Sequence, residues 1–253
     1  MQQPSESDIE AAKAYLLQRL DAERSMSYNL EIVMREAAER IVEILYSAKI
    51  PPAVGSYENL PPAVQMQVDE VVEWLKETID DYFLTLAIAD HEENRDSILP
   101  IVLGENHGQT FEERLSDYCE KYRNELMLLI GAGLFLGIAE SALAKSIGEN
   151  LKHPYANQLL TDGIAAPLTY GRGRTNSMFT AINDLTRYGI AEGWMQNQYI
   201  RNRKDGCIGW YVQRGSTYPC ELCDSMVGFH TDESDLPLYH SHCCCIATPI
   251  YLK

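Results

Sequence analysis

Long apolar segments are scarce in this chain of 253 residues. The longest, from Leu126 to Ala139, contains three glycines, and it is shorter than the roughly 20 apolar residues that a membrane-spanning helix needs. The first ten residues, MQQPSESDIE, also lack the basic and apolar regions of a signal peptide. We therefore expect a protein that is made in a reducing cytoplasm and has no membrane partner.

Positive charge is also scarce, and it is unevenly distributed. The chain holds 21 Lys and Arg against 37 Asp and Glu, a formal net charge of −16. Residues 1–171 carry the acidic excess, whereas residues 172–214 are basic overall. Phosphate backbones repel an acidic surface, which argues against a dedicated nucleic-acid-binding protein. Contact with nucleic acid is limited to 172–214, where solvated helix faces are the simpler interpretation of the basic residues.

Signatures of common enzymes are absent or incomplete. No G-x-S-x-G nucleophile elbow occurs. The glycines at 131, 133 and 137 lie in a helical pattern without the strand that precedes a dinucleotide-binding loop. Residues 219–223 match the P-C-x-x-C half of the zinc deaminase signature, but the only H-x-E, at 91–93, lies far upstream. We predict no catalytic residues; the alternative is a zinc-dependent enzyme, deaminase- or hydrolase-like, that uses Cys220 and Cys223.

Helical periodicity dominates the chain before residue 205. Capping boxes at Ser7–Glu10 and Thr110–Glu113 predict two helix starts. Pro51 and Pro52 should end a helix, residues 99–108 are expected to form a connector, and residues 151–174 are expected to be irregular. The apolar stripes predict helices over 9–20, 30–45, 64–86, 111–147 (with a break near Gly131 or Gly137) and 178–194.

Two strands are predicted near the C-terminus. Residues 208–213 (IGWYVQ) and 246–252 (IATPIYL) are rich in aromatic and β-branched residues, and Pro249 favours an edge position for the second strand. The expected fold class is α+β, a mostly helical N-terminal part followed by a small, zinc-stapled module that contains the strands. We expect a helical N-terminal region at 1–108 and a second region at 109–253, with a Cys/His module at 207–253.

Five of the seven cysteines lie between residues 220 and 245. Cys220 and Cys223 form C-x2-C, and His240 and Cys243 form H-x2-C sixteen residues later. Two such turns, each with two ligands that point at one ion, complete a tetrahedral zinc site. Four protein ligands leave no position open for water, so we expect zinc in a structural role, stabilising a module with a small core.

The ligand set stays open in the second half of this pattern. Cys243 and Cys245 share one face of an extended segment while Cys244 points away, so Cys245 can replace Cys243 or His240. The alternative to a metal site is a group of packed thiols. Two further histidines are spare candidates for ligands: His230 and His242.

The segment from residue 207 to 250 is similar to the C-terminal signature of phage minor head proteins of the Mu F-like head morphogenesis family. That signature has an aromatic strand, a polar turn, C-x2-C, a glycine, a variable loop with proline, H-x2-C-x-C and a final strand. Arg174-Thr175 takes the place of the family's Arg-Thr near the start of the preceding helix, so the resemblance extends over 110–253. The matching residues of the signature are Trp210, Cys220, Cys223, Gly228, Pro237, His240, Cys243, Cys245 and the strand at 246–251.

Two positions depart from the family pattern, with Ser241 in place of proline and Cys244 in place of the arginine between the last two cysteines. These departures leave the metal ligands intact but not the role of that arginine. The resemblance implies a minor capsid protein in the virion, at the capsid interior or portal vertex, made in the host bacterial cytoplasm. It implies capsid, scaffold or portal proteins as partners and no catalytic activity. A zinc-stapled adaptor protein of a bacterial host is a further alternative.

Overall fold

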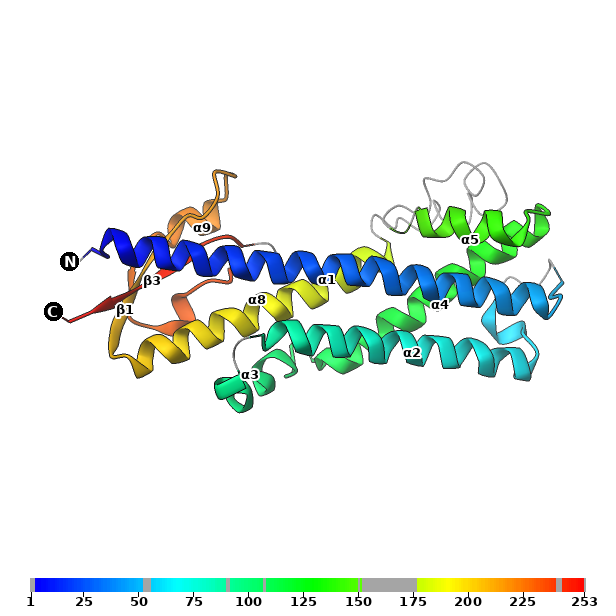
Figure 1. Cartoon of the computed structure of the whole chain (residues 1–253), viewed down its shortest axis with the longest axis horizontal. Helices are drawn as coiled ribbons and strands as arrows, with labels where there is room; N and C mark the ends of the chain where they lie inside the picture. The colour runs from blue at the N-terminus through cyan, green and yellow to red at the C-terminus, as the bar shows by residue number, and fades with distance from the viewer. Residues whose placement is uncertain are drawn as a thin grey trace. The chain divides into compact units, whose positions relative to one another are not determined.

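The computed structural model describes residues 3–51, 56–89, 92–106, 108–149, 151, 177–239 and 243–252. In these residues, long helices precede a small antiparallel sheet near the C-terminus (Figure 1). The predicted α+β fold class, mostly helical with a small β-containing part, is confirmed. Within the described residues, no helix is long and apolar enough to cross a membrane. The segment predicted to be irregular, 151–174, lies outside the described residues except for Leu151.

The first helix, α1 (Glu6–Ser47), is a single helix where the periodicity predicted two. No glycine or proline occurs between residues 5 and 47, so the polar residues between the two apolar stripes do not end the helix. The predicted capping box at Ser7–Glu10 is wrong by two residues. The Ser5 hydroxyl accepts a hydrogen bond from Asp8 N at 3.2 Å, and the Asp8 carboxylate accepts one from Ser5 N at 3.2 Å.

Two helices follow the 3-10 turn η1 (Tyr57–Asn59). Helix α2 (Pro62–Ala87) begins at Pro62, two residues before the apolar stripe that predicted it. The 3-10 turn η2 (Glu92–Asn94) leads into helix α3 (Arg95–Val102), so the prediction of a connector at 99–108 is wrong over its first residues. Helix α3 forms despite Pro100 because Ile98 and Val102, one turn apart, are both buried.

Helix α4 (Phe111–Phe135) begins at the predicted capping box. Thr110 Oγ1 accepts a hydrogen bond from Glu113 N at 3.2 Å, and Glu113 Oε2 accepts one from Thr110 N at 2.8 Å. The helical pattern breaks at Gly137, one of the two predicted positions, where a φ of 68° favours glycine. Helix α5 (Glu140–Glu149) follows this turn.

Helix α8 (Met178–Lys204) leads into a three-stranded antiparallel sheet with the order β2-β1-β3. The two predicted strands are present, and β3 lies at an edge, as Pro249 predicted. Strand β2 was not predicted. The strands are β1 (Cys207–Gln213), β2 (Gly228–His230) and β3 (Ile246–Tyr251), with the short helix α9 (Glu221–Ser225) between β1 and β2 and the 3-10 turn η4 (Glu233–Asp235) between β2 and β3.

The chain forms two compact units, each built from separate segments. Helix α1 contributes residues to both units, so they do not coincide with the regions 1–108 and 109–253 expected from the sequence. Unit 1 consists of Met1–Met26, Phe83–Glu105 and Thr186–Lys253, and unit 2 consists of Ser27–Tyr82 and Asn106–Leu185.

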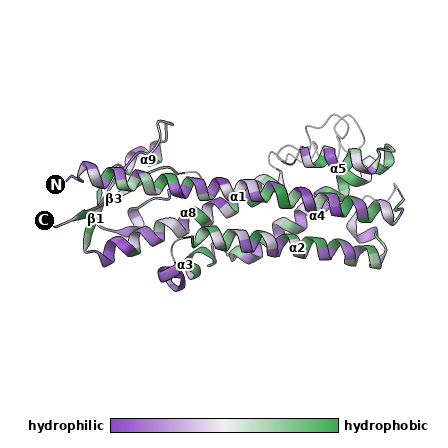
Figure 2. Cartoon of the chain, viewed as in Figure 1, coloured by the Kyte–Doolittle hydropathy of each residue, from purple (hydrophilic) through white to green (hydrophobic). Residues whose placement is uncertain are grey.

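Unit 2 is held together by apolar stripes on α1, α2 and α4. Hydrophobic and hydrophilic residues form stripes along these helices (Figure 2), and the buried ones recur three or four positions apart. The Tyr122 hydroxyl also donates a hydrogen bond to the Met34 carbonyl at 2.9 Å. The buried side chains of these stripes include Ala37, Ile41 and Leu45 of α1, Val68, Leu75 and Ile79 of α2, and Leu115, Cys119, Leu126 and Ile130 of α4.

Candidate metal centre

The sheet of unit 1 has a small core in which thiols take a large share. Trp210 of β1 is completely buried, and the ring of Tyr199 packs edge-on against it with centroids 5.6 Å apart. The Arg203 guanidinium lies over the same indole ring at 4.2 Å. The buried cluster consists of Met195, Tyr199, Cys207, Trp210, Val212, Cys223, Leu236, Cys243, Cys245 and Ala247.

The C-x2-C segment forms a single helical turn. The Cys220 carbonyl accepts a hydrogen bond from Asp224 N at 2.9 Å, and the Cys223 carbonyl accepts one from Met226 N at 3.3 Å. This turn is α9, and it carries Cys223 into the core, where the residue is only 3% exposed. Cys220, at the start of the turn, is half-buried and packs against the same cluster.

The segment that precedes β3 contains three consecutive cysteines, which face alternate sides of the chain. Cys243 and Cys245 are 2% and 3% exposed, whereas Cys244 is half-buried. Burial raises the pKa of Cys244, and its charged neighbours are Arg19, Glu23 and Arg187 rather than the sulfur cluster alone. Cys244 therefore faces another side, as the alternation of an extended chain predicts.

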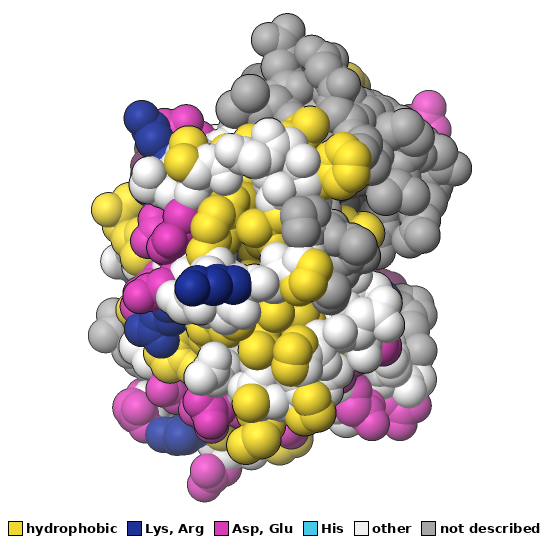
Figure 3. Space-filling view, turned by 90° about the vertical axis from the view of Figure 1, so that its right-hand side faces the viewer, with side chains coloured by type: hydrophobic (Ala, Val, Ile, Leu, Met, Phe, Trp, Pro, Cys, Tyr) yellow, Lys and Arg dark blue, Asp and Glu magenta, His cyan; other side chains and the backbone are white. Residues whose placement is uncertain are grey.

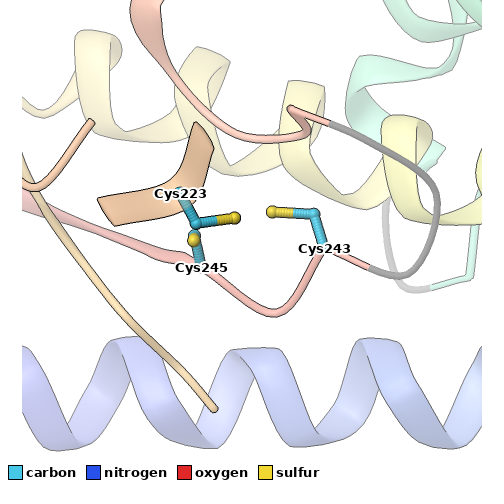
Figure 4. Close-up of side chains that lie close together, drawn as sticks. All are labelled: Cys223, Cys243 and Cys245. Atoms are coloured by element: carbon cyan, nitrogen blue, oxygen red, sulfur yellow. The ribbon is translucent and has the colours of Figure 1, made fainter. Parts of the chain in front are cut away.

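The thiols of Cys223, Cys243 and Cys245 converge, and their three Sγ atoms lie within 4.8 Å of one another. Figure 4 shows Cys223 on α9 with its sulfur directed toward that of Cys243, and Cys245 beside them on the segment before β3. In a tetrahedral site with metal–sulfur bonds of about 2.3 Å, two sulfurs lie roughly 3.8 Å apart. The three thiols therefore fit a metal ion with a contraction of about 1 Å or less.

Without a bound cation, the thiols of Cys223 and Cys245 favour their protonated forms. Burial raises the pKa of Cys223 to about 11, and hydrogen bonds with Cys220 and Cys243 act in the same direction. The pKa of Cys245 is raised as well, first by its hydrogen bond with Cys243 and then by burial. A metal ion must displace these protons, so its affinity for the site should increase with pH.

The remaining predicted ligands are Cys220 and His240, with His230 and His242 as spare candidates. Cys220 is not one of the three converging thiols, although its side chain is a hydrogen-bond neighbour of Cys223. His240 and His242 lie outside the described residues. His230, a spare candidate, is directed elsewhere, because its Nε2 lies 2.9 Å from the Met226 carbonyl oxygen and its Nδ1 lies 3.5 Å from Asp235.

Arg19 of α1 was not predicted from the sequence; it is 1% exposed and donates a hydrogen bond from Nη2 to the Cys243 carbonyl at 2.6 Å. A signal for it exists in the helical spacing. Ala12, Leu16, Arg19, Glu23 and Met26 recur at intervals of three or four residues, so a charged pair occupies the buried face of α1.

A tight backbone contact also fixes this segment. Gly215, in the turn after β1, lies so close to the Cys244 carbonyl that a β-carbon at this position would overlap with it. Only glycine fits such an approach.

Comparisons of the chain with protein-family models, curated proteins and solved structures found no match.

Proposed function

We propose that this chain is a phage minor head protein of the Mu F-like type, with a structural and assembly role at the capsid interior or the portal vertex. The observation that carries the proposal is the convergence of Cys223 with Cys243 and Cys245. These residues come from the two separate halves of the signature, C-x2-C and H-x2-C-x-C. Strands β1 and β3 bracket the two halves and pair with each other.

Burial favours a structural ion over a catalytic one. A catalytic zinc site keeps one position open to water or substrate. Cys223, Cys243 and Cys245 are at most 3% exposed, so the sulfur side of the centre is closed to substrate. We propose zinc as the ion, with Cys220 or His240 as the fourth ligand. This arrangement accounts for the thiols without catalysis, which is why we prefer it to a zinc-dependent enzyme.

Exposed apolar side chains on the helices supply a surface for partners. Met66 of α2 is 64% exposed, and Phe135 at the end of α4 is 59% exposed. Figure 3 shows hydrophobic side chains gathered on one face, interrupted by acidic and basic ones. Apolar patches of this kind mark sites of protein–protein contact. We propose that this surface binds capsid, scaffold or portal proteins.

The test is incorporation into phage heads. Procapsids assembled with the wild-type chain, purified on a density gradient and analysed by mass spectrometry, are expected to contain it at low copy number. The Cys223→Ser variant should be depleted from the particles, whereas Cys244→Ser, altered in the same segment outside the converging thiols, should be retained. Absence of the wild-type chain from purified procapsids would contradict the proposal.

A second measurement separates the structural centre from an enzyme. Elemental analysis of the purified chain before and after chelation counts the zinc ions, and X-ray absorption counts the ligands around each ion. We expect a single zinc with four protein ligands. A centre with three protein ligands and one water would favour the hydrolase or deaminase alternative instead.

A further inference from the structure

A buried ion cluster lies next to the thiols in unit 1. Arg19 Nε is 3.3 Å from Glu23 Oε1, and Arg187 Nη2 is 2.9 Å from Glu23 Oε2. Arg19 and Glu23 are 1% and 3% exposed. The Arg187 side chain is 24% exposed. Burying a charge costs several kcal/mol for each ion, so the buried Arg19 and Glu23 need compensating interactions.

The cluster is not electrically balanced by its own members. It contains two guanidinium groups and one carboxylate, and arginine keeps its charge at any physiological pH, so its net charge is +1. Nε and Nη1 of Arg19 have no hydrogen-bond partner within the described part of the chain. The cluster therefore has a net positive charge, and the buried Arg19 has a donor, Nη1, without a hydrogen bond in the described residues.

When the thiol centre holds a metal ion, it carries a negative charge that balances the positive charge of this cluster. Three thiolates and one divalent cation carry a net charge of −1, and a neutral histidine as fourth ligand leaves that value unchanged. Arg19 connects the two groups directly, because its Nη2 donates to the carbonyl of Cys243, whose sulfur belongs to the centre. On the same module, Arg214 pairs with Asp224 and so adds no net charge.

We propose that Arg19 is a positioning and charge-balancing residue of the metal centre, which holds the Cys243 backbone in place and offsets the negative charge of the metal–thiolate group. The same contact links metal binding to helix α1, since loading the centre supplies a negative charge beside this net positive cluster. This role depends on the metal centre and not on the assignment as a head protein.

Cobalt binding to the full chain tests this role, because Co²⁺ bound to thiolates gives a charge-transfer absorption band that reports the geometry of the centre. Residues in the outer shell of metal sites typically change affinity by about 10- to 100-fold when they are replaced. We expect Arg19→Met to weaken Co²⁺ and Zn²⁺ binding by that factor, measured by competition with a chelator. Arg19→Lys should restore part of the affinity.

Glu23→Gln separates this role from a purely structural one. It keeps the shape of the side chain but removes the negative charge, so our proposal predicts tighter metal binding, opposite in sign to Arg19→Met. If Arg19 served only to pack α1, both changes would weaken binding. Arg24→Met, on the exposed side of the same helix, is the matched control and should leave the affinity unchanged.

The possible failures are distinguishable. A wild-type chain that takes up neither Co²⁺ nor Zn²⁺ overturns the metal centre and the role of Arg19 together. A chain that binds metal equally well with Arg19 and with Arg19→Met overturns the role of Arg19 alone. Weaker binding in Glu23→Gln also overturns it. Circular dichroism of each variant establishes that the helices are still formed.

Discussion

Helices α2 and α4 of unit 2 bury stripes of aliphatic residues, whereas the sheet of unit 1 buries four thiols, three of them converging, beside a charged cluster. Unit 2 also contains a buried carboxylate, Glu125, which accepts a hydrogen bond from Met178 N at 3.3 Å. Its core is otherwise built from long amphipathic helices. Unit 1 has both a thiol cluster and more than one buried charge in contact.

The difference has a physical reason in how many apolar side chains the sheet of unit 1 and the helices of unit 2 can bury. A long helix buries an apolar residue at every turn, and each such side chain contributes about 1.5–3 kcal/mol. The strands of unit 1 have three to seven residues each, so they bury few apolar side chains. Cross-linking by an ion replaces the missing core in small modules. The stability of the sheet of unit 1 should therefore depend on metal, whereas that of unit 2 should not.

Two buried cysteines outside the converging group allow the unfolding of each unit to be measured separately. Cys207 belongs to unit 1 and Cys119 to unit 2, and they are 5% and 1% exposed. Their labelling by a thiol reagent during urea unfolding, located by mass spectrometry, reports when each unit opens.

We expect the largest effect from Cys223→Ser. Structural zinc contributes on the order of 10 kcal/mol to the folding of small modules, and a serine hydroxyl is a poor replacement for a thiolate ligand. The variant should lose its zinc, and Cys207 should be labelled at a much lower urea concentration than in the wild type. The midpoint for Cys119 should stay the same.

Cys244→Ser is the matched control for this change, because it removes a neighbouring thiol that does not converge with the other three. It should retain zinc and the wild-type midpoint for Cys207. The staple interpretation of unit 1 is wrong if Cys223→Ser keeps both the zinc and the protection of Cys207.

The second prediction concerns pH. Burial raises the pKa of Cys223 to about 11 and that of Cys119 to about 12, above the value of about 8.5 for an exposed thiol. A raised pKa means that the folded state favours the protonated thiol. Its contribution to stability is fully present below pH 8.5 or so and is lost as pH rises toward the folded-state pKa. Metal-free protein should therefore lose stability in both units above that pH, by roughly 3–5 kcal/mol at about 1.4 kcal/mol per pKa unit.

Metal should remove this pH dependence from unit 1 only. A metal-bound thiolate has no proton to release, so the unfolding midpoint reported by Cys207 should stop falling at alkaline pH in the zinc-loaded chain. The midpoint reported by Cys119 should fall as before. Equal behaviour of the two cysteines with and without zinc would mean that the ion does not stabilise unit 1.

Local signals account for the parts of the fold that the sequence predicted. The Thr110–Glu113 capping box, the proline at the start of α2 and the glycine after α4 each act on their own neighbours in the chain. Strands β1 and β3 are similarly marked by their aromatic and β-branched residues. The alternation of side chains along an extended segment is also a local signal, and it predicted which of the last three cysteines face inward.

Features that depend on tertiary contacts were not predictable in this way. Helix α1 continues through a polar stretch, and α3 forms around Pro100 because packing stabilises residues with weak local preference. Strand β2 has only three residues and exists through its pairing with β1. Cys220 fits the ligand spacing but lies outside the converging trio, and the contact from Arg19 to Cys243 spans over 200 residues.

The smallest expected effect comes from the helix caps, one in each unit. Thr110→Ala removes the side chain that accepts from Glu113 N at the start of α4, and such losses cost about 1 kcal/mol. Cys119 lies on the same helix, so its labelling midpoint should fall, while metal affinity and the midpoint for Cys207 stay constant. Ser5→Ala is the counterpart in unit 1 and should shift Cys207 alone. If Thr110→Ala lowers both midpoints equally, the two units unfold as one cooperative structure, and their different cores do not give them separate stabilities.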